Sequence, residues 1–89
     1  NSETLIAQIM KNPSIIVYST SWCQPCKFAK RLLDSKALEY SEIDIEEKGW
    51  SREDLFEITG GRTVPQIVID EKPIGGYDDL LKLEQEGKL

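Results

Sequence analysis

The sequence predicts an α/β domain with a four-stranded mixed sheet and helices on both of its faces. Short β-branched apolar segments alternate with segments whose apolar residues recur at helical spacing. The first two strand segments are separated by a helical segment, which favours parallel strands joined by a right-handed crossover. The last two are separated by only two residues, which predicts an antiparallel hairpin. A chain of 89 residues has the length of one domain, so we expect a single domain over residues 1–89.

The first half of the chain is expected to contain a helix, a strand, a helix and a strand. A helix is predicted over Glu3–Lys11, whose apolar residues share one face, and Asn12-Pro13 ends it. Ser14–Ser19 contains four consecutive apolar residues and is typical of a central strand. A helix follows over Pro25–Ser35 with the apolar stripe Phe28, Ala29, Leu32 and Leu33. A second strand is predicted over Leu38–Ile45, with inward candidates Leu38, Tyr40, Ile43 and Ile45.

The second half is expected to contain a helix, a hairpin and a final helix. Ser51 to Asp54 has the pattern of a capping box, and Gly60-Gly61 ends the helix that follows. A third strand is predicted over Gln66–Asp70, and a turn at Glu71-Lys72 leads to a fourth strand around Ile74. The last helix begins with acidic residues near Asp78 and ends at Gly87.

Composition excludes several classes of partner. The net charge is −5 and the isoelectric point is about 4.7, whereas nucleic acids and anionic membranes require a basic face. The longest uninterrupted apolar run is Ile15–Tyr18, so we expect no membrane span, and no secretory signal is visible. The chain has no histidine, the commonest metal ligand and neutral-pH base.

Cys23 and Cys26 form a Cys-x-x-Cys motif and are the only cysteines. A disulfide framework needs more cysteines, and this pair closes too small a loop to stabilise the fold much. Redox chemistry and metal binding are the main possibilities. A zinc site needs four ligands, so it would require a second chain; a passive disulfide or buried thiols are further alternatives.

The position of the motif favours redox chemistry. Cys23 lies between a predicted strand and a predicted helix, where the helix N-terminus stabilises a thiolate. Lys27 adds a positive charge one turn later. We therefore expect Cys23 to be exposed and to attack first, and Cys26 to be shielded and to resolve the mixed disulfide.

Two later motifs are candidate binding segments. Val64 precedes Pro65 just before a strand, where a cis bond would expose the Val64 N–H and C=O groups to an extended peptide; an ordinary trans proline is the alternative. Gly75-Gly76 lets the backbone approach a ligand, and the helix headed by Tyr77-Asp78 could hold a carboxylate. A plain turn with an aspartate cap is the alternative.

In this order the three motifs resemble those of the glutaredoxin family, a branch of the thioredoxin-like superfamily. The resemblance runs from about Ser14 to Leu89. It implies a thioredoxin-like fold, which agrees with the four-stranded mixed sheet flanked by helices on both faces. It also implies a dithiol enzyme with glutathione as electron donor and no metal.

The resemblance further implies roles for individual residues. Cys23 would be the nucleophile and Cys26 the resolving thiol. Val64, before a cis Pro65, would pair with the cysteinyl backbone of glutathione. The expected glutathione-binding residues are Lys27, Arg52, Val64, Pro65, Gly76, Tyr77 and Asp78. Among them, Arg52 would meet the glycyl carboxylate, and the start of the last helix the γ-glutamyl end; on charge alone Arg52 is also typical of a solvated helix residue.

The active-site segment departs from the family pattern. Trp22-Cys23-Gln24-Pro25-Cys26 replaces the usual Cys-Pro-Tyr-Cys and is similar to the thioredoxin motif. The aspartate that thioredoxins bury six residues before the first cysteine is Val17 here, and Thr20 stands where glutaredoxins usually have a cation.

We therefore expect a monomeric, cytoplasmic glutaredoxin that reduces protein disulfides and glutathione mixed disulfides. Its partners would be glutathione and disulfide-containing or glutathionylated proteins, with no nucleic acid and no membrane. The alternatives are a thioredoxin-like protein reduced by a dedicated reductase, and an iron–sulfur cluster scaffold or carrier.

Overall fold

A computed structural model describes residues 14–89 of the chain. The elements are, in order, β1 (Ile15–Ser19), α2 (Gln24–Ser35), β2 (Ser41–Asp44), α3 (Arg52–Thr59), β3 (Gln66–Ile69), β4 (Lys72–Gly75) and α4 (Tyr77–Gln85). This is the order predicted for this part of the chain. The helix expected over Glu3–Lys11 lies outside the described residues.

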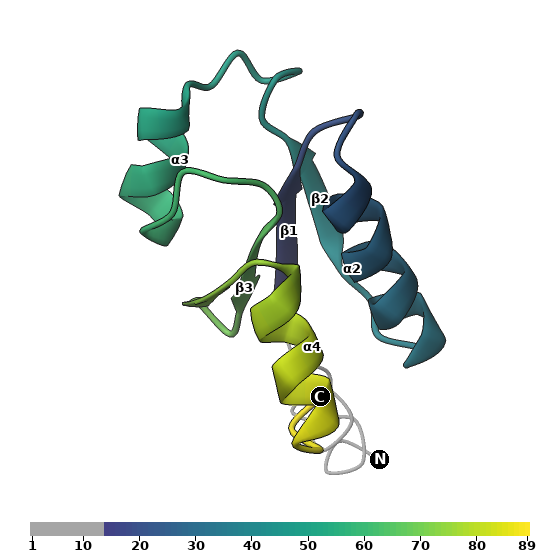
Figure 1. Cartoon of the computed structure of the whole chain (residues 1–89). Helices are drawn as coiled ribbons and strands as arrows, with labels where there is room; N and C mark the ends of the chain where they lie inside the picture. Colours follow the sequence, from purple (N-terminus) through teal and green to yellow (C-terminus); the bar gives the residue numbers. More distant parts are fainter. Residues whose placement is uncertain (1–13) are drawn as a thin grey trace, which may run out of the picture.

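The four strands form one mixed sheet in the order β2-β1-β3-β4. β1 runs parallel to β2, with α2 as the crossover, and antiparallel to β3 (Figure 1). β3 and β4 form the expected antiparallel hairpin, and β4 carries Pro73 at the outer edge of the sheet. The turn lies one residue earlier than predicted, at Asp70-Glu71, because Lys72 already pairs with Ile69. Both turn residues have positive φ angles, 50° and 68°, as a tight two-residue hairpin requires.

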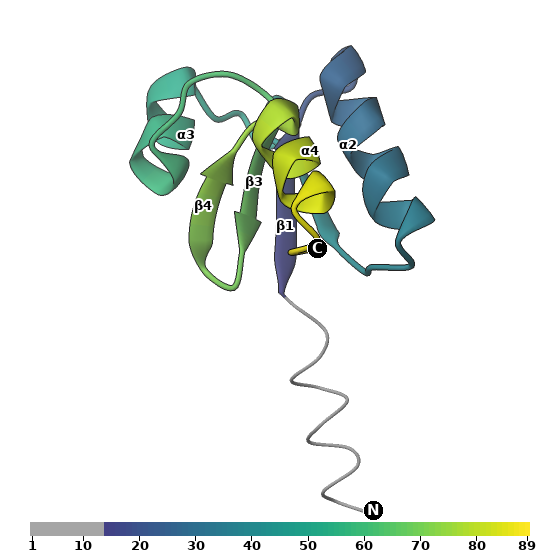
Figure 2. The same ribbon diagram turned by 60° about the horizontal axis from the view of Figure 1, so that its bottom comes forward.

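Helices cover both faces of the sheet. α2 and α4 lie side by side on one face, and α3 covers the other (Figure 2). Successive side chains of β1 point to opposite faces, so each face has its own core. The core beneath α2 and α4 contains Ile15, Val17, Ala29, Leu33, Ile67 and Leu80. The core beneath α3 contains Tyr18, Ile45, Leu55 and Val68.

The second strand is shorter than predicted. Leu38 and Tyr40 precede β2 and pack against the α2–α4 core, whereas Ile43 and Ile45 pack on the α3 side. Glu42 therefore takes a position on the α2 face that an apolar residue would normally fill. It is accommodated there by hydrogen bonds rather than by apolar packing.

The helix ends follow local sequence signals. Ser51 and Asp54 form the predicted capping box of α3: Asp54 N–H donates to Ser51 Oγ at 3.2 Å, and Ser51 N–H donates to the Asp54 carboxylate at 2.8 Å. Gly60 ends this helix with a φ of 80°. Within residues 14–89, no helix has both the length and the apolar character that a membrane crossing requires.

Candidate active site

The two cysteines lie at the start of α2, directly after the turn that follows β1. A disulfide joins them, and their Cα atoms are 5.2 Å apart. Cys23 is the N-cap of the helix, and its Sγ accepts a hydrogen bond from the Cys26 N–H at 3.2 Å. The sulfur of Cys23 thus lies at the positive end of α2, in the environment that stabilises a thiolate.

Burial of the pair differs in part from the expectation. Cys26 is fully buried, as predicted, but Cys23 is only 3% exposed in this oxidised form, so the prediction that it is exposed is wrong here. The reason is local packing: Cys23 Sγ is bonded to Cys26 and lies 3.5 Å from the carbonyl oxygen of Val64. Its neighbours Trp22 and Pro25 are both exposed.

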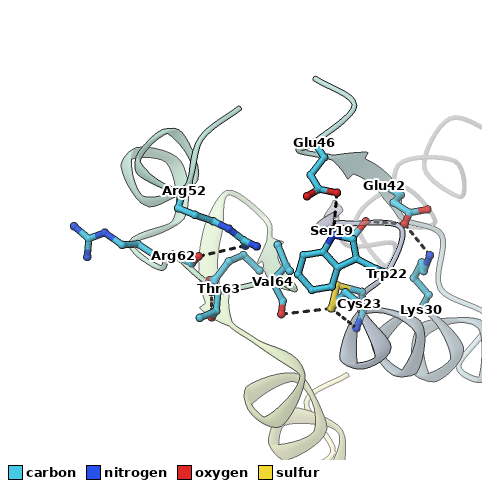
Figure 3. The surroundings of a disulfide bond; sticks show 12 residues. Ser19, Trp22, Cys23, Lys30, Glu42, Glu46, Arg52, Arg62, Thr63 and Val64 are labelled. Carbon is cyan, nitrogen blue, oxygen red and sulfur yellow. Dashed lines mark hydrogen bonds and ion pairs between the residues drawn. A yellow bond between two sulfur atoms is a disulfide. The ribbon is translucent and has the colours of Figure 1, made fainter. Parts of the chain in front are cut away.

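The segment opposite the cysteines contains the cis peptide bond that the resemblance implies. The Val64–Pro65 bond is cis, so the trans alternative is wrong. Pro65 is buried at the start of β3, and Val64 is half-buried. Figure 3 shows the Val64 carbonyl directed at Cys23, which brings residues 41 positions apart together at one end of the sheet.

The third motif forms the start of α4. Gly76 is the N-cap, and its N–H donates to the Asp79 carboxylate at 3.1 Å, so the N-cap is not the aspartate that the alternative interpretation assumed. The N–H groups of Tyr77 and Asp78 belong to the first turn, where helices offer donors to a ligand. Gly75 has a φ of 112°, and a Cβ there would collide with the Asp79 carboxylate, so this position requires glycine.

A groove of about 520 Å³ connects these segments. Its lining residues are Pro25, Phe28, Thr63, Val64, Pro65, Gly76, Tyr77, Asp78 and Asp79. The structure therefore brings together five of the predicted glutathione-binding residues. Phe28, predicted to belong to the buried stripe of α2, is 45% exposed, and its ring centroid lies 5.9 Å from that of Tyr77. Sequence reasoning did not assign Phe28, Thr63 or Asp79 to the site.

Arg52 borders a second hollow of about 240 Å³, next to the first. The two share Thr63 and Val64, and the second is completed by Trp22, Arg52 and Arg62. Arg52 extends toward Trp22, whereas the side chain of Arg62 points away and bonds to Glu53 at 2.7 Å (Figure 3). Arg52 is half-buried and not merely solvated. Lys27 is exposed on α2 and lines neither hollow.

A hydrogen-bond network lies on the other side of the dithiol turn. Glu42 accepts hydrogen bonds from the ammonium of Lys30 and the hydroxyl of the buried Ser19, each at 2.7 Å. The bond from Lys30 is the main reason that the pKa of Glu42 lies below its ordinary value. Thr20, which follows Ser19, is buried and carries no charge, so the cation usual in the family is missing at this position. No cluster of three or more potential metal-ligating side chains occurs among residues 14–89.

Comparison with known proteins agrees with this geometry. The family model described as glutaredoxin matches residues 15–74, about two thirds of the chain. The chain belongs to the glutaredoxin family. A glutaredoxin of Pseudomonas aeruginosa is 44% identical over 77 residues, which are 86% of this chain and 92% of that protein. Glutaredoxin 3 of Escherichia coli K12 is 40% identical over 76 residues, covering 85% and 92%.

Solved structures of the family share the fold. A complex of buckwheat glutaredoxin with glutathione superimposes with a TM-score of 0.77 at 31% identity, over 96% of this chain and 81% of that one. A dithiolic glutaredoxin of Trypanosoma brucei brucei gives 0.72 at 30% identity, over 94% and 90%. Like other glutaredoxins, the protein is a glutathione-dependent thiol–disulfide oxidoreductase with a thioredoxin-like fold.

Proposed function

We propose that Cys23 is the nucleophile of this oxidoreductase and that Cys26 is the resolving thiol. One observation carries the assignment: only Cys23 lies at the helix N-terminus and beside the groove segment Val64-Pro65. Cys26 is the third residue of α2 and is fully buried, so we expect an incoming disulfide to react with Cys23 first.

The reaction on a glutathione mixed disulfide needs only Cys23. Its thiolate attacks the glutathione sulfur, the substrate thiolate leaves and takes a proton, and a Cys23–glutathione disulfide remains. The thiolate of a second glutathione molecule then attacks the glutathione sulfur of this disulfide. This releases oxidised glutathione and restores the Cys23 thiolate.

A protein disulfide requires both cysteines. Cys23 first forms a mixed disulfide with the substrate protein, and the Cys26 thiolate then attacks the Cys23 sulfur. The substrate leaves as a dithiol, and the product on the enzyme is the Cys23–Cys26 disulfide that the structure contains. Two glutathione molecules reduce it and leave as one molecule of oxidised glutathione.

Glutathione would lie along the two adjoining hollows. Its cysteinyl backbone would pair with Val64, next to the cis Pro65. Its γ-glutamyl carboxylate would meet the N–H groups of Tyr77 and Asp78, and its ammonium the Asp78 carboxylate. Its glycyl carboxylate would meet Arg52 in the second hollow. Gly76 lets the backbone approach closely, and Lys27 contributes positive potential from the exposed side of α2.

The physiological setting follows from this chemistry. We propose a monomeric enzyme without a metal cofactor, acting in the cytoplasm, where glutathione keeps such thiols reduced. Its substrates would be proteins that contain disulfides or are glutathionylated.

The proposal is tested by a glutathione-coupled assay with a glutathionylated peptide and with a protein disulfide. Cys23→Ser should abolish both activities. Cys26→Ser should keep activity on the glutathionylated peptide and lose most activity on the protein disulfide. Equal loss of both activities in both variants would contradict these roles. Faster turnover with a thioredoxin reductase than with glutathione and glutathione reductase would favour the thioredoxin-like alternative, which Trp22 and Pro25 suggest.

A further inference from the structure

Trp22 is exposed but held in a defined orientation beside the active site. Its side chain is 57% exposed, although a large apolar ring is normally buried. It forms one wall of the second hollow, directly before Cys23 in the chain. The ring therefore lies beside the space proposed for the glycyl end of glutathione.

A hydrogen bond fixes the indole from one side. Trp22 Nε1–H donates to the Glu46 carboxylate at 2.9 Å (Figure 3). Glu46 belongs to the turn after β2, and this turn is itself ordered, because the Asp44 carboxylate accepts the N–H groups of Glu46 at 3.0 Å and of Glu47 at 3.1 Å. The anchor of the indole is thus part of a hydrogen-bonded turn.

The guanidinium of Arg52 lies over the face of the indole. The Arg52 Cζ atom lies 5.8 Å from the ring centroid, within the range of a cation–π interaction. Arg52 also donates to the carbonyl of Arg62, at a long 3.4 Å. A cation–π contact uses the face of the guanidinium and leaves its N–H groups available for a carboxylate. A guanidinium already held in place also loses less conformational entropy when a ligand binds.

We propose that Trp22 is a positioning residue that holds Arg52 for the terminal carboxylate of the glutathione moiety, and that Glu46 orients Trp22 for this role. The inference rests on the proposed function, because it requires that glutathione occupies the two hollows. The interacting side chains of Glu46, Trp22 and Arg52 affect how tightly the substrate binds, equally before and during thiol exchange. It therefore acts on KM and leaves kcat unchanged.

The test uses a glutathionylated peptide and the same peptide carrying the glycyl ethyl ester of glutathione, which lacks that carboxylate. For the acid substrate, Trp22→Ala should raise KM about two- to fivefold, the size expected from an exposed cation–π contact, with kcat unchanged. For the ester, Trp22→Ala should change neither constant. In an Arg52→Ala background, Trp22→Ala should have no further effect on the acid substrate.

Three further variants test the hydrogen bond between Glu46 and the indole. Glu46→Ala and Glu47→Ala remove the same charge from adjacent exposed positions, but only Glu46 accepts a hydrogen bond from the indole. Glu46→Ala should raise KM for the acid substrate relative to Glu47→Ala. Trp22→Phe keeps a ring face without its N–H group, so its KM should lie between those of wild type and Trp22→Ala.

The outcomes separate this inference from the proposed function. If Trp22→Ala raises KM equally for the acid and the ester, Trp22 does not act through the carboxylate and the inference is overturned, while the roles of the cysteines stand. Additive effects of Trp22→Ala and Arg52→Ala would overturn it in the same way. Absence of glutathione-dependent turnover in the wild type would overturn the proposed function itself, and the inference with it.

Discussion

The Sγ atom of Cys23 lies 3.5 Å from the carbonyl oxygen of Val64. This contact brings the dithiol at the start of α2 against the turn before β3. A substrate that pairs with the Val64 backbone, as proposed above, would lie next to the reacting sulfur, and this proximity would favour thiol exchange. The same sulfur accepts a hydrogen bond from the Cys26 N–H, which favours negative charge on it after reduction.

In the reduced protein, Cys23 should have a pKa well below the ordinary thiol value of about 8.5. The helix N-terminus and the Cys26 N–H both stabilise its thiolate. Ultraviolet thiolate absorbance against pH, measured on Cys26→Ser so that only Cys23 titrates, checks this. A transition at or above the ordinary value would mean that this environment does not activate the thiol.

Arg52→Ala and Asp78→Ala should each weaken binding of a glutathionylated substrate by about 1 kcal/mol, the cost of losing a partly exposed charged hydrogen bond. The effect should appear as a raised KM with kcat nearly unchanged, because these side chains hold the ligand equally before and during exchange. Arg31→Ala removes an exposed cation from the same protein outside both hollows and is the control. Wild-type KM values in both variants would show that glutathione does not bind as proposed.

Gly75→Ala should lower the free energy of unfolding by about 1–3 kcal/mol, since both φ and the available space oppose a side chain. Gly87→Ala is a matched control: Gly87 also has a positive φ, 73°, but a Cβ there would meet nothing within 4 Å. Thermal unfolding should therefore show a larger loss for Gly75→Ala. Equal losses would mean that the collision of the added Cβ with the Asp79 carboxylate does not lower the free energy of unfolding.

Glu42→Gln should lower stability at neutral pH and have less effect in acid. The pKa of Glu42 is lowered from 4.5 mainly by the Lys30 hydrogen bond, so its ionised form stabilises the fold above the unfolded-state pKa. That contribution is lost as pH falls through the lowered pKa. The Glu42 side chain is 39% exposed, so we expect less than about 1 kcal/mol at pH 7. Urea unfolding at pH 7 and below pH 4.5 measures the difference, with Glu39→Gln as control; an equal difference at both pH values would exclude this linkage.

Much of the fold could be predicted because its signals are local. The β-branched run before the cysteines, the capping box at Ser51 and the two-residue hairpin link each specify an element within a few residues. The site segments were also predictable, since Cys23, Val64 and Gly76 belong to short motifs in a fixed order.

The contacts that sequence reasoning missed are those between distant segments. Phe28 has the spacing of a core residue, yet it is exposed. Its ring lies beside that of Tyr77 in the groove, and Tyr77 comes 49 positions later in the chain. Burial of Cys23 depends on the Val64 turn, and the orientation of Trp22 on Glu46, 24 positions away. Local patterns predict the elements and the hairpin, but they do not specify contacts between side chains that are far apart in the sequence.

Pro73 in β4 has a consequence for how the protein behaves at high concentration. An outer strand presents unpaired backbone groups that can recruit the strand of another molecule, which is a common route to aggregation. Proline has no N–H, so β4 lacks a donor in the middle of its four residues. On the opposite edge β2 is equally short and ends in Asp44, whose charge repels a second copy of the same strand. Within residues 14–89, both outer strands are thus short and carry a feature that disfavours pairing with a further strand.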